Sequence, residues 1–253
     1  NSFCTLLACF FPEGRASARG RQREMVSTVA PAAKDPVEAL LLTTVLSHVA
    51  MLPSAVMLYR RRWLFESASN IFCILTSFMY HFTQSIERPF FLSELKWHRL
   101  DNIGALIAFG LFFIHLANMR DASTEMGFKF VVVLVALLTQ EKAPWDVRYT
   151  FGPILMWGSL PIFWHLFVHR RPPQYEWRHF IIGFGSLFVA AGFFVRGLDE
   201  KTDPFRMYHG MWHVLGGFSS YHLWRVVSKP TLNNAMAQFL ATGKTRDENL
   251  LPV

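Results

Sequence analysis

Long apolar blocks alternate with short polar connections along this chain. Segments such as Val131–Leu138 and Phe180–Val195 contain almost no polar side chains, and a helix needs about 20 mostly apolar residues to cross a bilayer. The segments that approach this description are Val37–Tyr59, Trp63–Ser85, Leu100–Met119, Gly127–Gln140, Tyr149–Val168, His179–Val195 and Phe205–Val227. The connections leave no room for a folded soluble domain. The pattern therefore predicts an all-α fold, a bundle of seven transmembrane helices.

These helices divide the 253 residues into three regions. Residues 35–228 form the seven-helix membrane domain, residues 1–34 an N-terminal tail and residues 229–253 a C-terminal tail. Ser2–Phe11 is apolar but too short to span a bilayer, and Ala16-Ser17-Ala18 behind it is typical of the end of a signal peptide. The alternative is that the residues before Met25, the first methionine, lie outside the mature protein. The predicted function uses none of residues 1–34.

Composition narrows the class of protein. The chain is 52% hydrophobic and 17% charged, whereas soluble domains carry about 25% charged residues. A disordered chain, a disulfide-rich miniprotein and a soluble enzyme are therefore poor fits. The formal net charge of +7 does not indicate a nucleic-acid partner, because the basic residues lie between apolar blocks and form no basic stripe. Cys4, Cys9 and Cys73 form no CxxC motif and indicate no disulfide framework.

The basic residues predict the orientation in the membrane. Arg60-Arg61-Arg62 follows the first predicted helix directly, and loops rich in Lys and Arg remain on the cytoplasmic side. We therefore expect an N-terminus outside the cell or in a lumen, a cytoplasmic C-terminus, and residence in the plasma membrane, Golgi or endoplasmic reticulum. Lys129 and Lys142 are expected to extend from the ends of the short fourth segment toward water. The lipid bilayer is the one partner indicated at this point.

Polar side chains from three distant helices are predicted to lie at the same membrane depth. Ser77 and His81 fall near the outer end of the second segment, and Asp101 falls at the start of the third. His209 and His213 open the seventh segment. Because ionisable groups inside membrane helices are costly, they are functional candidates by default. The topology thus predicts one polar site near the outer side.

The spacing of these residues suits a metal ion. His209 and His213 are four residues apart, so both rings project from one face of a helix. A third imidazole from His81 would complete the ligand set of a catalytic zinc with one open position. Asp101 would orient or deprotonate the attacking water, and Ser77 would stabilise an oxyanion. The simpler alternatives are that Ser77 bonds to its own helix and that Asp101 caps the third helix.

A second set of histidines lies toward the predicted cytoplasmic ends. It comprises His115, His165, His169 and His222, with His48 in the middle of the first segment. Facing histidines here would suit a haem, whereas the structural alternative is hydrogen bonding between helices. Retinal is disfavoured because the seventh segment contains no lysine for a Schiff base.

These motifs resemble the CREST superfamily of membrane proteins, which contains alkaline ceramidases, progestin and adipoQ receptors, and the transmembrane protein 8 / myomaker branch. The resemblance covers nearly all of residues 37–227. It rests on Ser77-Phe-Met-Tyr-His81, Asp101 and His209-Gly-Met-Trp-His213. The chain is most similar to the myomaker branch in Ala50-Met51-Leu52-Pro53 followed by Arg60-Arg61-Arg62, in Gly152-Pro153-Ile154, and in Val195-Arg196 before Tyr208-His209.

The resemblance implies zinc held by His81, His209 and His213, with Ser77 and Asp101 completing the site. It further implies hydrolysis of an amide or ester bond in a lipid with an acyl chain, such as ceramide or a glycerophospholipid. The sequence therefore predicts a zinc-dependent intramembrane lipid hydrolase. The alternative is a non-enzymatic, myomaker-like fusion factor or receptor in which zinc is structural. The sequence identifies neither the lipid, nor a protein partner, nor an oligomeric state.

Overall fold

The computed structural model describes residues 35–143, 146, 148–199 and 202–228. Within them the helices form seven continuous or nearly continuous stretches, and no strand occurs. The first stretch contains α2 (Val37–Leu40), η1 (Leu41–Val45), η2 (Leu46–Met51) and α3 (Leu52–Arg60). The others are α4 (Leu64–Ile86), α5 (Glu94–Ala117), α6 (Ala122–Lys142), α7 (Arg148–Phe163) with η3 (Trp164–His169), α8 (Trp177–Arg196), and η4 (Pro204–Arg206) with α9 (Met207–Leu223). The predicted tails 1–34 and 229–253 lie outside the described residues.

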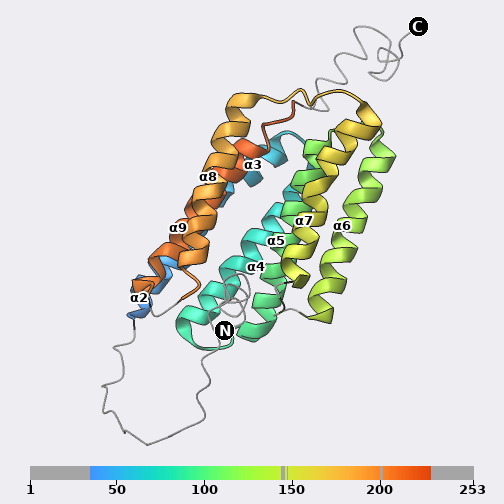
Figure 1. Ribbon diagram of the computed structural model, residues 1–253. Coiled ribbons are helices and arrows are strands. Elements are labelled where there is room, and N and C mark those ends of the chain that lie inside the picture. Colours follow the sequence, from blue (N-terminus) through green and yellow to red (C-terminus); the bar gives the residue numbers. More distant parts are fainter. Residues whose placement is uncertain (1–34, 144–145, 147, 200–201, 229–253) are drawn as a thin grey trace, which may run out of the picture.

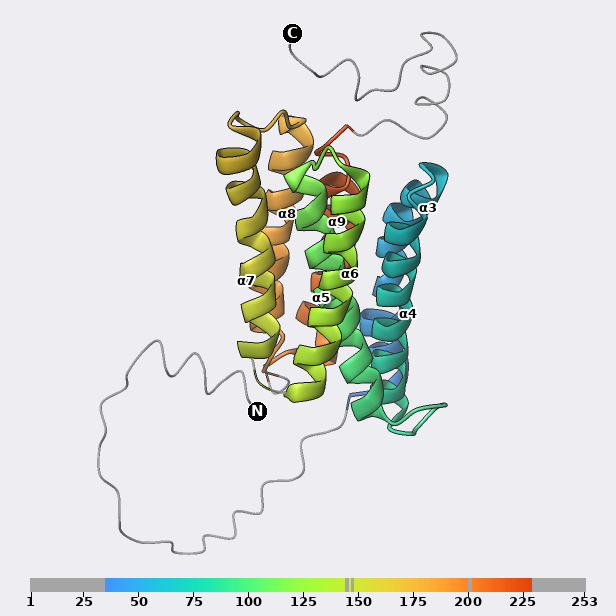
Figure 2. The same cartoon turned by 90° about the vertical axis from the view of Figure 1, so that its right-hand side faces the viewer.

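The stretches run side by side along one common direction, with α5 at the centre (Figures 1 and 2). α5 packs against α4, α6 and α7, and twelve of its residues are buried. α9 packs against α8 and against the first stretch. The apolar core surrounds the second half of α5, where Leu111 and Ile114 belong to the same buried cluster as Leu223 at the end of α9. The polar candidates therefore lie outside this core, toward the opposite end of the bundle.

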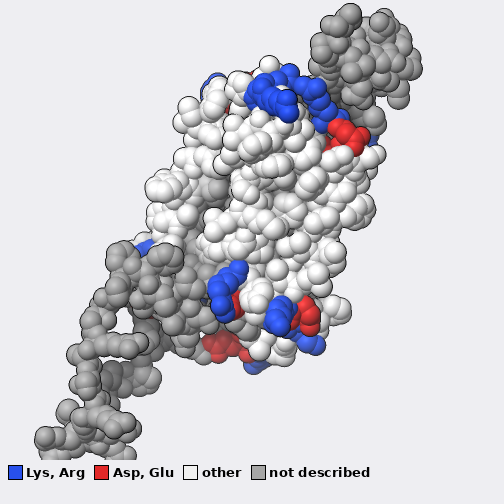
Figure 3. Space-filling view, turned by 45° about the vertical axis from the view of Figure 1, so that its right-hand side comes forward, with Lys and Arg blue, Asp and Glu red and all other residues white. Residues whose placement is uncertain are grey.

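Five helices among the described residues are long and apolar enough to cross a membrane. They are Val37–Arg60, Glu94–Ala117, Ala122–Lys142, Arg148–His169 and Trp177–Arg196. On the face drawn in Figure 3, charged residues gather at the two ends of the bundle and leave a broad uncharged band between them. The protein is thus an integral, multi-pass membrane protein. Of the two remaining helices, α9 has only 17 residues and α4 carries many buried polar side chains.

Two helix starts differ from the prediction. The third helix begins at Glu94, with Ser93 as its N-cap residue, so Asp101 lies in its third turn and does not cap it. The prediction of a start at Leu100 was wrong because Glu94–Arg99, in which four of six residues are polar or charged, is also helical. The fourth helix begins at Ala122, where the Asp121 side chain accepts a hydrogen bond from the Thr124 backbone N–H.

Lys129 does not extend toward water as predicted. Its side chain is 9% exposed and forms ion pairs with Glu66 of α4 and, at 2.8 Å, with Glu125 one turn earlier. Two carboxylates satisfy the ammonium group and make its burial tolerable. The prediction was wrong because Glu66 approaches from another helix, which the spacing along α6 does not show.

The first stretch departs from regular α-helix in its middle. A π-helical segment, Leu41–Val45, is followed by the 3₁₀ segment Leu46–Met51. Pro53 follows at the start of α3, and a proline has no N–H to donate and clashes with the carbonyl four residues before it, here that of Val49. Such irregular turns are frequent at functional sites. This one contains His48.

Candidate metal centre

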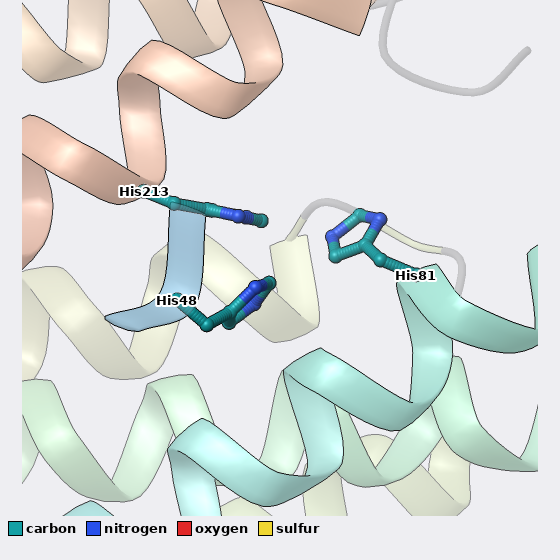
Figure 4. A group of neighbouring side chains, drawn as sticks. All are labelled: His48, His81 and His213. Carbon is teal, nitrogen blue, oxygen red and sulfur yellow. The ribbon is translucent and has the colours of Figure 1, made fainter. Parts of the chain in front are cut away.

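Four buried histidines meet where the first stretch, α4 and α9 come together. His48 comes from η2, His81 from α4, and His209 and His213 from α9. The ring centroids of His48 and His213 are 4.1 Å apart, and those of His81 lie 4.7 Å from His209 and 4.8 Å from His213. Figure 4 shows the rings of His48, His81 and His213 pointing toward one another. The predicted histidines are therefore together, and His48 is an additional member.

The Nδ1 hydrogen bonds of three rings leave Nε2 as the nitrogen with the lone pair, and in His81 this nitrogen accepts a hydrogen bond from Nε2 of His209. Nδ1 of His48 donates to the Val45 carbonyl at 3.1 Å, and Nδ1 of His81 donates to Oε1 of Gln84 at 3.3 Å. Nδ1 of His213 lies 3.1 Å from the Ser47 hydroxyl oxygen and 3.3 Å from the Thr44 carbonyl. A neutral imidazole that donates from Nδ1 carries its lone pair on Nε2. Bonds of this kind are those that orient metal-ligating histidines.

One of these Nε2 atoms has no partner among the described residues. Nε2 of His48 is buried without a hydrogen bond, which is a costly state for a polar atom inside a protein. The ligand atoms of His48, His81 and His213 all lie within 4.8 Å of one another. These three histidines can hold a metal ion.

His209 offers a fourth imidazole. Its Nε2 is 3.1 Å from Nε2 of His81, and its ring centroid is 4.8 Å from that of His213. Two nitrogens bound to one tetrahedral zinc are about 3.3 Å apart, given Zn–N bonds of about 2.0–2.1 Å. The His81–His209 spacing therefore already suits a shared zinc, whereas the 4.8 Å group would contract on binding.

Two glycines let α9 approach the first stretch this closely. A Cβ at Gly210 would lie 2.3 Å from the Thr43 carbonyl oxygen, and one at Gly217 would lie 2.5 Å from that of Ala50. Because these glycines are seven residues apart, they share one face of α9. Helix backbones approach most closely where such small residues meet. His213, between them, thereby reaches Thr44, Ser47 and His48.

Asp203 fixes the start of α9. It is fully buried, and its carboxylate accepts hydrogen bonds from the backbone N–H groups of Tyr208 at 2.8 Å and His209 at 3.1 Å. A carboxylate at this place satisfies free N–H groups of the first turn and interacts favourably with the helix dipole. The prediction did not include Asp203, although an aspartate shortly before a helix start is the usual signal for a cap.

Ser77 and Asp101 form a pair at the contact between α4 and α5. The Ser77 hydroxyl donates a hydrogen bond to the Asp101 carboxylate. Ser77 lies one turn before His81, a rise of about 6 Å. Close packing of the two helices at Gly104, where a Cβ would lie 2.9 Å from the Cα of Cys73, places the pair together. Asp101 can thus act as a base, with Ser77 as its donor.

Comparison with known families gives a match over most of the chain. Residues 37–214 match the family described as protein of unknown function (DUF3522). The chain belongs to the DUF3522 family. The matched region contains Ser77, Asp101 and all four histidines of the cluster, and it ends one residue after His213. No curated protein sequence matches the chain.

The second set of histidines in this DUF3522 protein does not form one site. Nε2 of His165 donates to the Leu116 carbonyl at 3.1 Å, and Nε2 of His169 lies 3.1 Å from the Asn118 carbonyl. His115 lies between two tryptophans, and His222 pairs with His179 through their Nδ1 atoms at 2.9 Å. These interactions match the structural alternative, in which histidines join helices.

The role of His48 was missed. Because His48 lies in the middle of the first predicted segment, we grouped it with the second set of histidines, toward the predicted cytoplasmic ends. The shift comes from the irregular turns of η1 and η2, which alter both the rise and the direction of side chains. Pro53 together with the nearby hydroxyl residues Thr43, Thr44 and Ser47 was the available signal of an irregular helix.

Proposed function

We propose that the protein is a zinc-dependent hydrolase that cleaves an amide or ester bond of a membrane lipid. The observation that carries this proposal is the convergence of imidazole nitrogens from three helices, with the Ser77 hydroxyl one turn before His81 and hydrogen-bonded to the Asp101 carboxylate. His81, His213 and His209 would hold the zinc, and His48 is the further imidazole beside them. Bound by three imidazoles, zinc supplies a Lewis acid and lowers the pKa of water to about 7.

The chain's own residues would then divide the remaining work. Asp101 would accept the proton of the attacking water and pass it to the leaving amine or alcohol. Ser77 would hold the Asp101 carboxylate in place, and its hydroxyl can turn to the developing oxyanion once Asp101 is protonated. Gln84 and the Thr44 carbonyl would keep His81 and His213 in the tautomer that binds metal.

The proposal includes the arrangement in the membrane. All seven helical stretches would cross the bilayer, with the N-terminus outside or luminal and the C-terminus cytoplasmic, as the Arg60-Arg61-Arg62 run favours. α4 and α9 would cross with their polar side chains turned toward neighbouring helices and away from lipid. The metal centre would then lie in the outer half of the membrane, within reach of water and of the ester or amide groups of lipids.

Metal content and turnover test the proposal together. We expect about one zinc per chain in detergent-purified protein, and hydrolysis of at least one member of a panel of ceramides and phosphatidylcholines. Asp101→Asn should retain zinc while lowering turnover at least about 100-fold, the usual contribution of a general base. Ser186→Ala, whose hydroxyl bonds only to its own helix, is the matched control. Full turnover in Asp101→Asn, or zinc-free folded protein, would contradict the proposal.

A second candidate function gains support from His48. A structural zinc site normally has four protein ligands, and His48, His81, His209 and His213 can supply four imidazoles. A non-enzymatic fusion factor or receptor would need no open position on the metal. X-ray absorption of the zinc-loaded protein separates the two: three nitrogens and one oxygen favour the hydrolase, and four nitrogens favour the closed structural site. His48→Ala should leave zinc bound if the protein is the hydrolase, and should weaken zinc binding if the site is the closed structural one.

A further inference from the structure

An apolar groove runs along the outside of the bundle between the first stretch and α4. Its volume is about 640 Å³, within the range of about 300–1,000 Å³ usual for small-molecule sites. The α4 wall consists of Ile74, Phe78 and Phe82, which share one face because they are four residues apart. The rings of Phe78 and Phe82 are nearly parallel, 9° apart. The groove is therefore open to the outside and has one aromatic wall.

The groove leads directly to the histidine cluster. His48 lines it together with Val45, and both are buried at its floor, with exposures of 2% and 7%. The His48 ring meets Phe78 edge-on, with centroids 6.3 Å apart, and meets His213 on its other side. A molecule in the groove would thus contact an imidazole of the metal centre without entering the bundle from its end.

The opposite wall faces the lipid. Leu42, Leu46 and Val49 line the groove and are 63%, 55% and 54% exposed, and they belong to a helix apolar enough to cross a membrane. Because the wall is continuous with the bilayer-facing surface, the molecules at its mouth are lipid acyl chains. Water would gain no hydrogen bonds from such a lining.

A carboxylate lies at the outer rim of the groove. Glu38 is the one charged residue among those that line the groove, and it is exposed. The ammonium group of a lipid headgroup would meet this carboxylate when the acyl chain lies in the groove. Ceramide carries no ammonium group.

We infer that the groove between the first stretch and α4 admits an acyl chain of a bilayer phospholipid whose headgroup carries an ammonium group, such as phosphatidylcholine. The chain enters sideways, lies against Phe78 and Phe82, and brings its ester toward His48 and the metal centre. The catalytic meaning of this inference rests on the proposed function, whereas occupancy of the groove does not.

Photolabelling tests the occupancy directly. The full-length protein is placed in phosphatidylcholine vesicles that contain a phosphatidylcholine with a diazirine in the middle of one acyl chain, and labelled residues are identified by mass spectrometry. We expect label on the floor residues Val45 and His48, which annular lipid cannot reach. Val49→Trp should fill the groove and reduce this label several-fold. Val189→Trp is the matched control, because Val189 is equally exposed, at 51%, on α8 outside the groove.

The headgroup is tested with a second probe. Floor label should be stronger with the phosphatidylcholine probe than with the same diazirine chain on phosphatidylglycerol, and Glu38→Gln should remove the difference. Absence of floor label, or equal effects of Val49→Trp and Val189→Trp, would overturn the groove, and equal labelling by both probes would overturn the headgroup assignment. Floor label in a protein without zinc or turnover would leave the groove standing and remove the hydrolase proposal.

Discussion

The two ends of the bundle use buried histidines in opposite ways. At the candidate metal centre, His48, His81 and His213 donate from Nδ1, and their ligand atoms lie within 4.8 Å of one another. At the other end, His165 and His169 donate from Nε2 to carbonyl groups at the end of α5. The oxygen atoms that accept these hydrogen bonds therefore select one histidine tautomer at the candidate metal centre and the other tautomer at the opposite end. Burial alone does not distinguish a ligand from a structural histidine, but the direction of the remaining lone pair does.

At the end of α5, the histidines that donate to carbonyl groups complete the hydrogen bonding of a helix terminus. The Leu116 carbonyl accepts from His165 at 3.1 Å and from the Tyr175 hydroxyl at 2.8 Å. The last carbonyls of a helix have no partner within it, and here side chains from η3 and the following loop supply one. Those histidines therefore close a helix end, and their replacement should affect stability and leave metal binding unchanged.

Removal of a ligand gives the largest expected difference between the two ends. His81→Ala removes the ring shared by both possible ligand sets and should lower zinc affinity by more than about 100-fold, beyond the loss usual for an outer-shell partner. His165→Ala should retain the full zinc content while lowering the thermal stability. Zinc measured by mass spectrometry after dialysis checks both variants. If His165→Ala lost zinc while His81→Ala retained it, the metal would bind at the opposite end of the bundle and the assignment of the metal centre would be wrong.

The close contact of α9 with the first stretch gives the next effect. Gly217→Ala would place a methyl group 2.5 Å from the Ala50 carbonyl oxygen, which should destabilise the protein by about 1–3 kcal/mol and separate His213 from His48. Gly216→Ala is the control, since a Cβ there has no atom within 4 Å. Thermal unfolding in detergent and zinc content, measured on both variants, test the prediction. Equal unfolding temperatures would show that the helices do not meet at Gly217.

A smaller effect is expected from the partner of His81. Gln84→Ala removes the oxygen that accepts from Nδ1 of His81 and should weaken zinc binding about tenfold, at the lower end of the range for such partners. The fold should persist, because Gln84 lies in the last turn of α4. Competition with a chelator of known affinity measures the change. Gln84→Glu, which keeps an acceptor at that position, should restore binding.

The smallest effect concerns Tyr175. Tyr175→Phe removes one hydrogen bond to Leu116 and should lower the free energy of unfolding by about 1 kcal/mol, with zinc unchanged. Burial raises the pKa of Tyr175 to about 12, above the usual value near 10. The folded state therefore holds this proton more tightly, and its contribution to stability is complete below about pH 10 and is lost as the pH rises toward 12. The difference in the free energy of unfolding between the wild type and Tyr175→Phe should therefore be smaller at pH 11 than at pH 8.

The sequence predicts the helices better than the site. The apolar blocks predict seven helices, and the described residues contain seven helical stretches. Five of these are long and apolar enough to cross a membrane, as burial in lipid demands nearly continuous apolar residues. His81, His209 and His213 could be grouped because they lie near the ends of regular helices, where depth follows from counting. His48 could not, because η1 and η2 interrupt the regular rise. The Glu66–Lys129 ion pair was also out of reach, since it depends on how α4 and α6 pack.

The limited apolar character of α4 and α9 has a consequence for how the protein is made. A segment with many polar residues partitions poorly from the translocon into lipid by itself, so α4 and α9 should depend on neighbouring helices for insertion. α9 emerges last and carries two of the four histidines. The metal centre therefore cannot assemble before α9 has been made. A chain that stops after α8 should insert its earlier helices, remain unable to bind zinc, and present an empty place beside the first stretch for the quality-control machinery of the membrane.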